Sequence, residues 1–380
     1  VIGLSVARAL KLRGLREVLL IERSSLGREA SFAAAGMLAP QAEADGANEF
    51  FHLACKSRDM YPAFASELYE ESGIDIELEK TGTLYLAFTD HDIDEVKNRY
   101  RWQSKAALPI ERLTARDALK LEPSISSNVQ MALKFPLDMQ VENRRLIKAL
   151  AVSNERSGVR MLTETSVKSM RINRRRLNGV ETSRGFVATE CVVVACGAWS
   201  SLIEISNAVD TGETTSPRLL SSSPLGDILV EPVRGQMLSF ATDPRITQHV
   251  IYSPRGYIVP RSDGRLLAGS TTEHVGFDKN VTDEGIQTIL TAAEEISPAV
   301  ASLPVTASWA GLRPRASDDL PVLGPCAEIE GVFYATGHYR NGILLAPITG
   351  ELLAGAIIDR EVAAIPHTFS PSRFGLVSVN

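Results

Sequence analysis

Cysteine, histidine and long apolar runs are all scarce in this chain of 380 residues. The four cysteines are too few and too scattered for a disulfide framework and have no metal-ligand spacing, and the six histidines form no metal set. We therefore expect a reducing compartment and no metal site. No apolar run reaches the roughly 20 residues of a transmembrane helix, so no membrane span is expected. The net charge of −6 provides no overall basic surface for nucleic acid.

The remaining composition is that of an ordinary globular protein. Hydrophobic residues make up 44% of the chain and charged residues 23%. These values exclude a disordered chain, a fibrous repeat and a small disulfide scaffold. At about 150 residues per domain, the length suggests two domains or one large unit with two lobes.

The first residues follow the order helix, strand, acid. Apolar residues recur at helical spacing over 4–12, and 17–22 is a short apolar run that ends at Glu22. In a dinucleotide-binding βαβ unit, an acid about 20 residues after the glycines binds ribose hydroxyls. Gly3 and Glu22 fit the last glycine and this acid. We expect the first strand and two earlier glycines to lie before Val1; the alternative is an ordinary α/β unit with a chance glycine.

Two further segments are suited to a flat or phosphate-bearing ligand. Residues 31–40 are mostly small, and small side chains let the backbone approach a ligand closely. Residues 189–200 contain a continuous apolar run that ends at Gly197, which is typical of a buried parallel strand beside a nucleotide. A poorly packed loop is the alternative interpretation of 31–40.

The last part of the chain has the most specific motifs. Residues 309–315 read Trp-Ala-Gly-Leu-Arg-Pro-Arg. A strand over 331–336 then leads into Gly-His-Tyr-Arg-Asn-Gly at 337–342 and a helix from about 348 to 359. A strand, a glycine turn and a helix N-terminus together form a geometry that binds anions or carbonyl groups.

In combination, these motifs resemble the FAD-dependent amine oxidases related to D-amino-acid oxidase. The resemblance rests on the βαβ piece that ends at Glu22, the loop 35–37, the run 193–200 and the motifs at 311–314 and 337–342. It covers essentially the whole chain, with the motifs in the order of the family. Within the family, the chain is most similar to the members that oxidise glycine for thiamine thiazole biosynthesis. The resemblance implies FAD as cofactor, a small amino acid as substrate and O2 as oxidant.

The same resemblance implies a role for each matching position. Glu22, Arg23 and the backbone of Val167 would hold the adenosine end of FAD, and the other positions would lie near the pyrophosphate or the flavin ring. The residues expected to bind the cofactor are Gly3, Glu22, Arg23, Ala30, Ser31, Ala35, Gly36, Met37, Val167, Gly197, His338, Tyr339, Arg340, Asn341, Gly342, Ile343 and Leu344. Arg313 would pair with the substrate carboxylate, Arg340 would border the substrate and Tyr257 would close the pocket.

Each substrate-binding residue also has a simpler interpretation. Arg313 could form a surface ion pair with Asp318 or Asp319, Arg340 could be a helix-terminal charge, and Tyr257 could be an aromatic residue packed in a sheet. Arginine nevertheless suits the proposed anchor, because its planar fork binds a carboxylate through two hydrogen bonds.

The implied reaction transfers a hydride from the substrate α-carbon to flavin N5, which leaves an imine, and O2 then yields H2O2. No residue is assigned as a general base, since the amine need only be neutral when it reacts, and His338 is expected to contribute its backbone. Two alternatives stay open. The protein could be a related flavin oxidase or dehydrogenase for sarcosine, D-amino acids or 2-hydroxy acids, or a flavin-binding module without catalytic activity.

The expected fold is α+β with two lobes and a ligand at their interface. The predicted Rossmann-like FAD-binding domain, without its first strand, comprises 1–80, 140–205 and 309–365. The predicted antiparallel-sheet substrate domain comprises 81–139 and 230–308, and 206–229 is expected to be a flexible loop. We expect a cytoplasmic protein, or one of the plastid stroma if a transit peptide precedes the chain. Whether the chain forms a homo-oligomer stays open.

Overall fold

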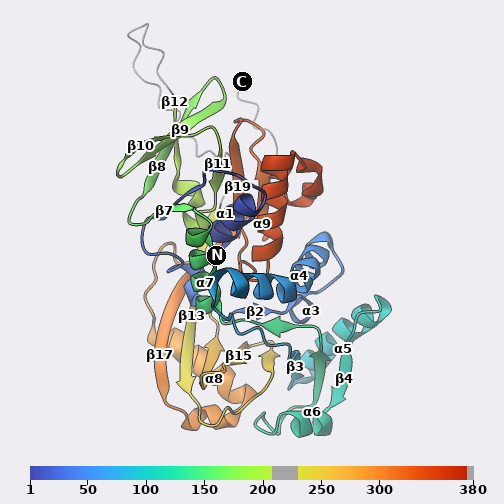
Figure 1. Cartoon of the computed structure of the whole chain (residues 1–380). Coiled ribbons are helices and arrows are strands. Elements are labelled where there is room, and N and C mark those ends of the chain that lie inside the picture. The colour runs from blue at the N-terminus through green and yellow to red at the C-terminus, as the bar shows by residue number, and fades with distance from the viewer. Residues whose placement is uncertain (208–229, 375–380) are drawn as a thin grey trace.

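The computed structural model describes residues 1–207 and 230–374. Figure 1 shows two lobes, a sheet lobe at the bottom (residues 83–135 and 230–316) and a mixed lobe above it (1–80, 140–207 and 317–374). The mixed helix and sheet content confirms the predicted α+β class. Most of the predicted loop 206–229 lies outside the described residues; residues 206 and 207 instead finish a strand, because they pair in parallel with 171 and 172.

One eight-stranded sheet forms the sheet lobe. Its strands, in spatial order, are β17 (Val305–Ala316), β13 (Val230–Ala241), β16 (Arg265–Gly269), β15 (Gly256–Pro260), β14 (Val250–Ser253), β3 (Thr83–Ala87), β5 (Met131–Phe135) and β4 (Glu111–Thr114). Every neighbouring pair is antiparallel except β14 and β3. The sheet therefore has the antiparallel character predicted for the substrate domain.

One detail of this sheet differs from the prediction. Strand β17 pairs with β13 from Ala316 to Val305, so residues 309–316 lie in this sheet, although the sequence suggests that they belong to the FAD-binding domain. Residues 249–259 are a hairpin of two strands, because the chain turns back between Ser253 and Gly256. The hairpin places Tyr252 opposite Tyr257.

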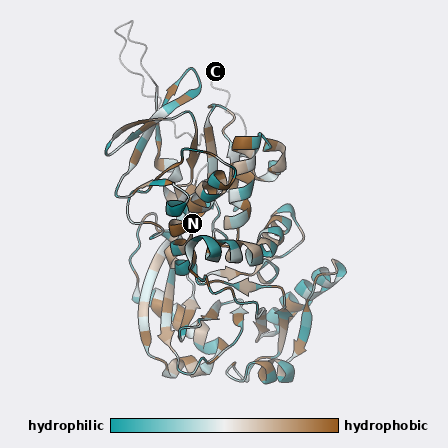
Figure 2. Cartoon of the chain, viewed as in Figure 1, coloured by the Kyte–Doolittle hydropathy of each residue, from teal (hydrophilic) through white to brown (hydrophobic). Residues whose placement is uncertain are grey.

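Helices cover and extend the sheet lobe. These are α5 (Asp90–Lys105), α6 (Ala115–Leu121), α8 (Asp283–Ile296) and a 3-10 turn at Pro298–Ser302. Helix α5 begins where the Thr89 side chain accepts from the Asp92 backbone and Asp92 accepts from the Thr89 backbone, the reciprocal cap that favours a helix start. Hydrophilic residues predominate along α5, which lies at the edge of the lobe (Figures 1 and 2).

The mixed lobe contains shorter sheets between helices. Its longer helices are α1 (Ile2–Leu12), α4 (Glu49–Ser72), α7 (Asn143–Arg156) and α9 (Ala346–Ala354), with short helices α2 (Ala30–Ala33) and α3 (Pro40–Glu43). Its strands are β1 (Leu19–Ile21), β2 (Met37–Leu38), β6 (Met139–Gln140), β7 (Arg160–Leu162), β8 (Val167–Asn173), β9 (Arg176–Thr182), β10 (Gly185–Ala188), β11 (Val192–Val194), β12 (Glu204–Asn207), β18 (Val322–Pro325) and β19 (Val332–Thr336). Short helical turns occupy Gly197–Leu202, Gly355–Asp359, Val362–Ala364, His367–Phe369 and Pro371–Phe374.

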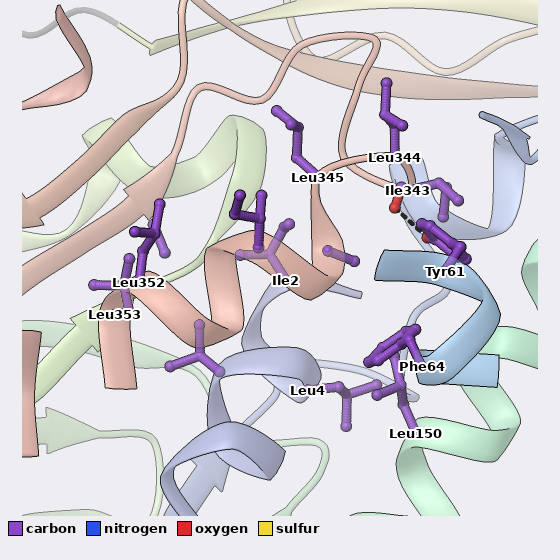
Figure 3. Packing of buried hydrophobic residues seen from close by; sticks show 14 of the residues in the cluster. Ile2, Leu4, Tyr61, Phe64, Leu150, Ile343, Leu344, Leu345, Leu352 and Leu353 are labelled. Carbon is purple, nitrogen blue, oxygen red and sulfur yellow. Dashed lines mark hydrogen bonds between the residues drawn. The ribbon is translucent and has the colours of Figure 1, made fainter. Parts of the chain in front are cut away.

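The strands expected to be buried and parallel have parallel partners. β1 pairs in parallel with β7, and β11 pairs in parallel with β19, whose other neighbour is the antiparallel β18. Helices α1, α4, α7 and α9 pack beside these strands and share one hydrophobic core. Figure 3 shows Ile2, Leu150 and Leu353 in this core, which joins segments that are far apart in the sequence.

Two structural features bear on the compartment and on metal binding. Within 1–207 and 230–374, no helix combines the length and the apolar character needed to cross a membrane. In the same ranges, no three His, Cys, Asp or Glu side chains lie close enough together to hold a metal ion.

Candidate active site

A cavity lies where the two lobes meet, and most of the residues predicted from the sequence line it. The predicted residues that line the cavity are Ala30, Ser31, Ala35, Gly36, Met37, Gly197, Tyr257, Arg313, His338, Tyr339, Arg340, Asn341, Gly342 and Ile343. They come from both lobes, as expected for a site at the interface. The predicted residues that do not line it are Gly3, Glu22, Arg23, Val167 and Leu344.

Three of these outlying residues lie close together at the end of β1. The Glu22 carboxylate accepts a hydrogen bond from Ser24 N at 3.1 Å. The Thr165 N–H donates to the Glu22 carbonyl at 2.9 Å, so the chain that enters β8 at Val167 passes beside Glu22. The Arg23 guanidinium lies 3.6 Å from the centroid of the Trp199 ring. This is a cation–π contact that the sequence did not indicate.

Gly3 and Leu344 have structural surroundings of their own. A Cβ added at Gly3 would lie 3.5 Å from the Cβ of Ala195, which is an ordinary contact. The close packing that we expected to require a glycine at this position is therefore absent. Leu344 is buried in the core of the mixed lobe, and its carbonyl accepts from the Ser57 hydroxyl at 2.6 Å.

The turn at 337–343 is held on two sides. Tyr339 N donates to the Pro314 carbonyl at 2.8 Å, which joins the two C-terminal motifs directly. From α4, the Tyr61 hydroxyl donates to the Ile343 carbonyl (Figure 3). Tyr61 is fully buried, so this bond is shielded from water. The sequence did not single out Tyr61 or Ser57, because one polar group on the apolar face of a helix is a weak signal.

The side chain of His338, a residue of this turn, is buried. Its Nε2 lies 3.0 Å from the Thr349 hydroxyl, and burial lowers its pKa to about 3. The imidazole is therefore neutral at physiological pH and is engaged with a residue of α9. The His338 side chain therefore contacts α9 in its neutral form.

A second loop, 35–37, forms another side of the cavity. Gly36 has φ 69°, and a Cβ there would lie 2.0 Å from the Val141 carbonyl oxygen, so only glycine fits. Val141 N donates to the Gly36 carbonyl at 2.9 Å. The buried Arg261 donates to the Ala35 carbonyl at 2.6 Å and to the Val141 carbonyl at 2.8 Å. Arg261, which the sequence did not reveal, therefore holds the backbone of this loop.

Arg313 is a half-buried cation without a carboxylate partner among the described residues. Its guanidinium donates to the Ser270 hydroxyl at 2.7 Å and to the Thr271 carbonyl at 3.0 Å. Burial lowers its pKa, but an arginine stays protonated in proteins. A buried charge is stable only when it is paired. The side chain is therefore ready to bind an anion in the cavity.

The surface ion pair considered for Arg313 does not form. Asp319 pairs with Arg315, two residues further along β17, and Asp318 pairs with Arg373. Side chains alternate between the two faces of a strand, so Arg313 and Arg315 share one face. The acids near Arg315 satisfy its charge, while Arg313 points toward the cavity.

Gly235 of β13 makes room for the Arg313 side chain. The two residues lie across the β13–β17 pair, and a Cβ at Gly235 would lie 2.1 Å from Arg313 Nη1. Two heavy atoms that are not bonded to each other cannot approach this closely, so a side chain at Gly235 would collide with the guanidinium. The Arg313 side chain therefore lies over a position of β13 that has no side chain.

Tyrosine side chains and one acid surround the remaining part of the cavity. The Tyr257 hydroxyl donates to the Met237 sulfur at 3.3 Å, and the Tyr252 and Tyr257 rings lie 5.4 Å apart between centroids. The Tyr252 hydroxyl donates to Glu43 Oε1 at 2.7 Å. Glu43 lines the cavity beside Arg340 and was not predicted from the sequence.

Small residues make up much of the cavity wall, which fits a flat aromatic cofactor. The alanines and glycines that line it are Ala30, Ala33, Ala34, Ala35, Gly36, Ala39, Ala195, Gly197, Gly235, Gly311, Ala335 and Gly342. Strand β17 packs tightly here, since a Cβ at Gly311 would lie 2.4 Å from Ala33 Cβ. Such a wall lets the backbone approach a ring system, so the residues present fit the expected flavin.

The fold and this cavity define an FAD-dependent oxidoreductase of the D-amino-acid oxidase type. Residues 1–356 match the model of the DAO family, described as FAD dependent oxidoreductase, and the chain belongs to that family. This confirms the resemblance inferred from the sequence motifs and the predicted cofactor.

Known relatives of similar length match this chain over nearly all of its residues. The glycine oxidase of Pseudomonas aeruginosa is 34% identical over 98% of this chain and 96% of its own. The crystal structure of glycine oxidase from Geobacillus kaustophilus is also 34% identical, with a TM-score of 0.88 over 98% of this chain and 96% of that chain. A longer relative, the bifunctional protein ThiO/ThiG of Synechocystis sp., is 32% identical over 98% of this chain and 53% of its own.

Proposed function

We propose that this protein oxidises glycine or a similarly small amino acid with FAD and O2, giving an imine and H2O2. The observation that carries the proposal is the half-buried guanidinium of Arg313, which has no carboxylate partner among the described residues and lines the cavity between the lobes. An amino acid supplies the carboxylate that this cation lacks. The names of the relatives support glycine as the substrate.

In this proposal, each of three side chains has one task. Arg313 binds the substrate carboxylate, Tyr257 closes the pocket beside Met237, and Arg340 borders the substrate. Gly235 keeps the path of Arg313 free of side chains. Fixing the carboxylate in this way places the α-carbon in one orientation, and orientation contributes strongly to the rate of such a reaction.

The residues proposed to hold FAD come from three stretches of chain. Glu22, Arg23 and Val167 would bind the adenosine end, and loop 35–37 and turn 338–344 would border the flavin ring. Within the ranges predicted from the sequence, 1–80, 140–205 and the part of 309–365 after β17 would form the FAD-binding domain. When bound, FAD accepts a hydride from the substrate α-carbon and passes the electrons to O2.

The chain is not proposed to supply a general base. Burial lowers the pKa of His338 to about 3, so its imidazole is too weak a base to take a proton from the substrate amine at neutral pH. The pH dependence of the reaction then follows the titration of the substrate amine and not that of a histidine.

The biological setting proposed for this reaction is thiamine thiazole biosynthesis. The support is the relative named as bifunctional protein ThiO/ThiG, in which a chain like this one makes up about half of a longer protein. All four cysteines are free, which supports a reducing compartment such as the cytoplasm.

A substrate panel with peroxide detection tests the proposal. The FAD-loaded protein is mixed with glycine, sarcosine and D-alanine in air, and H2O2 is measured. Rapid H2O2 formation with glycine supports the proposal. Turnover that needs a quinone in place of O2 identifies a dehydrogenase instead. Flavin that no amine reduces under anaerobic conditions identifies a binding module, and either of these results overturns the proposal.

A further inference from the structure

Glu43 is an acid that lies inside the cavity and has no role in the mechanism so far. It is the last residue of the short helix α3 and lines the cavity together with Arg313 and Arg340. Its Oε1 accepts a hydrogen bond from the Tyr252 hydroxyl at 2.7 Å. The carboxylate is therefore held at a fixed place near the substrate-binding residues.

Arg340 is the natural counterpart of this acid. Arg340 is exposed, and in the part of the chain that the structure describes its side chain makes no hydrogen bond and no ion pair. The charge of Glu43 is nevertheless the largest influence on it and raises the pKa of Arg340. Glu43 and Arg340 line the same cavity, and no hydrogen bond or ion pair joins them in the described structure, so their opposite charges interact through space.

The charged side chains that line the cavity in the described ranges are Glu43, Arg313 and Arg340. Because the acid offsets one of the two cations, one net positive charge remains. That charge matches a ligand with one carboxylate, and a second carboxylate would meet the negative charge of Glu43.

The backbone that carries Glu43 is anchored in a buried polar network. The Asp138 carboxylate accepts from Gln41 N at 3.4 Å and from Ala42 N at 3.3 Å. The Gln103 side chain donates to the Gln41 carbonyl at 2.8 Å, and Arg99 donates to the Ala44 carbonyl at 3.0 Å. These bonds hold the backbone of α3 and of the residue that follows it, and so fix the position from which the Glu43 side chain extends.

We propose that Glu43 determines specificity by offsetting the charge of Arg340, so that the site accepts amino acids with one carboxylate and rejects those with two. This inference rests on the proposed function, in which Arg313 binds the single substrate carboxylate. Without the Glu43 carboxylate, Arg340 would serve as a second carboxylate anchor in the cavity that Arg313 also lines. Suitable pairs of probes are glycine with iminodiacetate, and acetate with malonate.

Binding and turnover of these probes test the inference in the FAD-loaded protein. Dissociation constants of acetate and malonate are measured from the change in flavin absorbance, which requires no turnover. In Glu43→Gln and Glu43→Ala we expect the ratio of the malonate to the acetate constant to fall at least about tenfold. The ratio of kcat/KM for iminodiacetate to that for glycine should rise by a similar factor.

Three variants serve as controls for charge and for fold. Glu43→Asp keeps the charge and should keep a ratio near that of the wild type. Tyr252→Phe removes the donor to Glu43 but not its charge, and should also keep the preference for one carboxylate. Glu294→Gln removes an exposed acid from α8 and should change neither ratio. Because each ratio is taken within one variant, a general loss of stability cancels.

The outcomes separate the inference from the proposed function. If Glu43→Gln and Glu43→Ala bind malonate and acetate in the wild-type ratio, the inference is overturned even when the wild type oxidises glycine. If the wild type binds acetate but oxidises no amino acid, the proposed function fails, and the binding ratios still decide the role of Glu43.

Discussion

The Arg261 guanidinium spans the two lobes: its Nη2 donates to the carbonyl oxygen of Ala35 at 2.6 Å. Arg261 follows β15 in the sheet lobe, whereas Ala35 belongs to the loop of the mixed lobe that lines the cavity. The side chain is almost completely buried and has no ion pair with the described residues. Burial lowers its pKa to about 10, so it is charged at neutral pH. A buried charge thus stabilises the backbone beside the proposed flavin site.

Arg261→Lys should weaken FAD binding. A lysine keeps the charge, but its single ammonium cannot replace the planar fork that reaches both the Ala35 and the Val141 carbonyls. One buried carbonyl left without a donor costs about 1–3 kcal/mol. We expect the dissociation constant of FAD, measured by quenching of flavin fluorescence, to rise roughly tenfold or more.

Arg255→Lys is the matched control for this change. Arg255 lies in the turn between β14 and β15 of the same sheet and pairs with Asp92 and Glu295. It does not line the cavity, so its replacement should leave FAD affinity unchanged. Equal affinity in Arg261→Lys and wild type would show that loop 35–37 does not depend on this contact.

Short motifs with a specific order predicted most of the cavity. The turn 337–342 and the motif around Arg313 come from distant strands, yet both were placed at the site before their contact through Tyr339 and Pro314 was visible. Both motifs were recognised because they resemble those of a known family; glycine permits backbone conformations that other residues disfavour, and Pro314 fixes the backbone after Arg313. The same holds for Gly36, where only a residue without Cβ fits.

Long-range partners could not be predicted in this way. Arg261, Tyr61 and Glu43 act at the site only because separate segments pack together, and each has an unremarkable local sequence. Strand lengths were also uncertain, since residues 159–172 split into β7 and β8 in different sheets. Continuous β propensity does not reveal where a chain leaves one sheet and enters another.

Tyr61→Phe should weaken FAD binding as well, through the turn at 337–343. The variant removes the hydrogen bond from the Tyr61 hydroxyl to the buried Ile343 carbonyl and leaves that oxygen with the Ala346 N–H, at 3.1 Å, as its remaining described donor (Figure 3). We expect the dissociation constant of FAD to rise about tenfold and the free energy of unfolding to fall by about 1–2 kcal/mol. Tyr69→Phe changes an exposed tyrosine of the same helix and should shift stability by less than about 0.5 kcal/mol. Similar behaviour of the two variants would contradict a role for Tyr61.

Asp138→Asn should change how stability depends on pH. Asp138 is fully buried, and burial raises its pKa to about 7, far above the value of about 3.9 expected in the unfolded chain. Between these values the folded protein binds more protons than the unfolded one. The free energy of unfolding of the wild type should therefore fall with rising pH, by up to about 1.4 kcal/mol per unit between pH 4 and 7.

The variant lacks this titrating group and should lack that part of the slope. Urea unfolding at pH 5, 6, 7 and 8 measures the difference between wild type and Asp138→Asn. We expect the wild type to lose stability relative to the variant from pH 5 to 7 and the difference to level off near pH 8. Parallel stability curves over this range would show that Asp138 does not change its charge there.

Arg313→Met should abolish most of the affinity for the amino-acid substrate while leaving FAD bound. Removing one partner of a buried charge pair costs about 3–5 kcal/mol, so kcat/KM for glycine should fall by roughly two to four orders of magnitude. Arg315→Met is the control on the same strand, because Arg315 pairs with Glu231 and Asp319 and does not line the cavity. Arg313→Lys should lie between the two, since an ammonium keeps the charge but loses the second hydrogen bond to the carboxylate. If Arg313→Met and Arg315→Met have the same KM for glycine, Arg313 is not the carboxylate anchor.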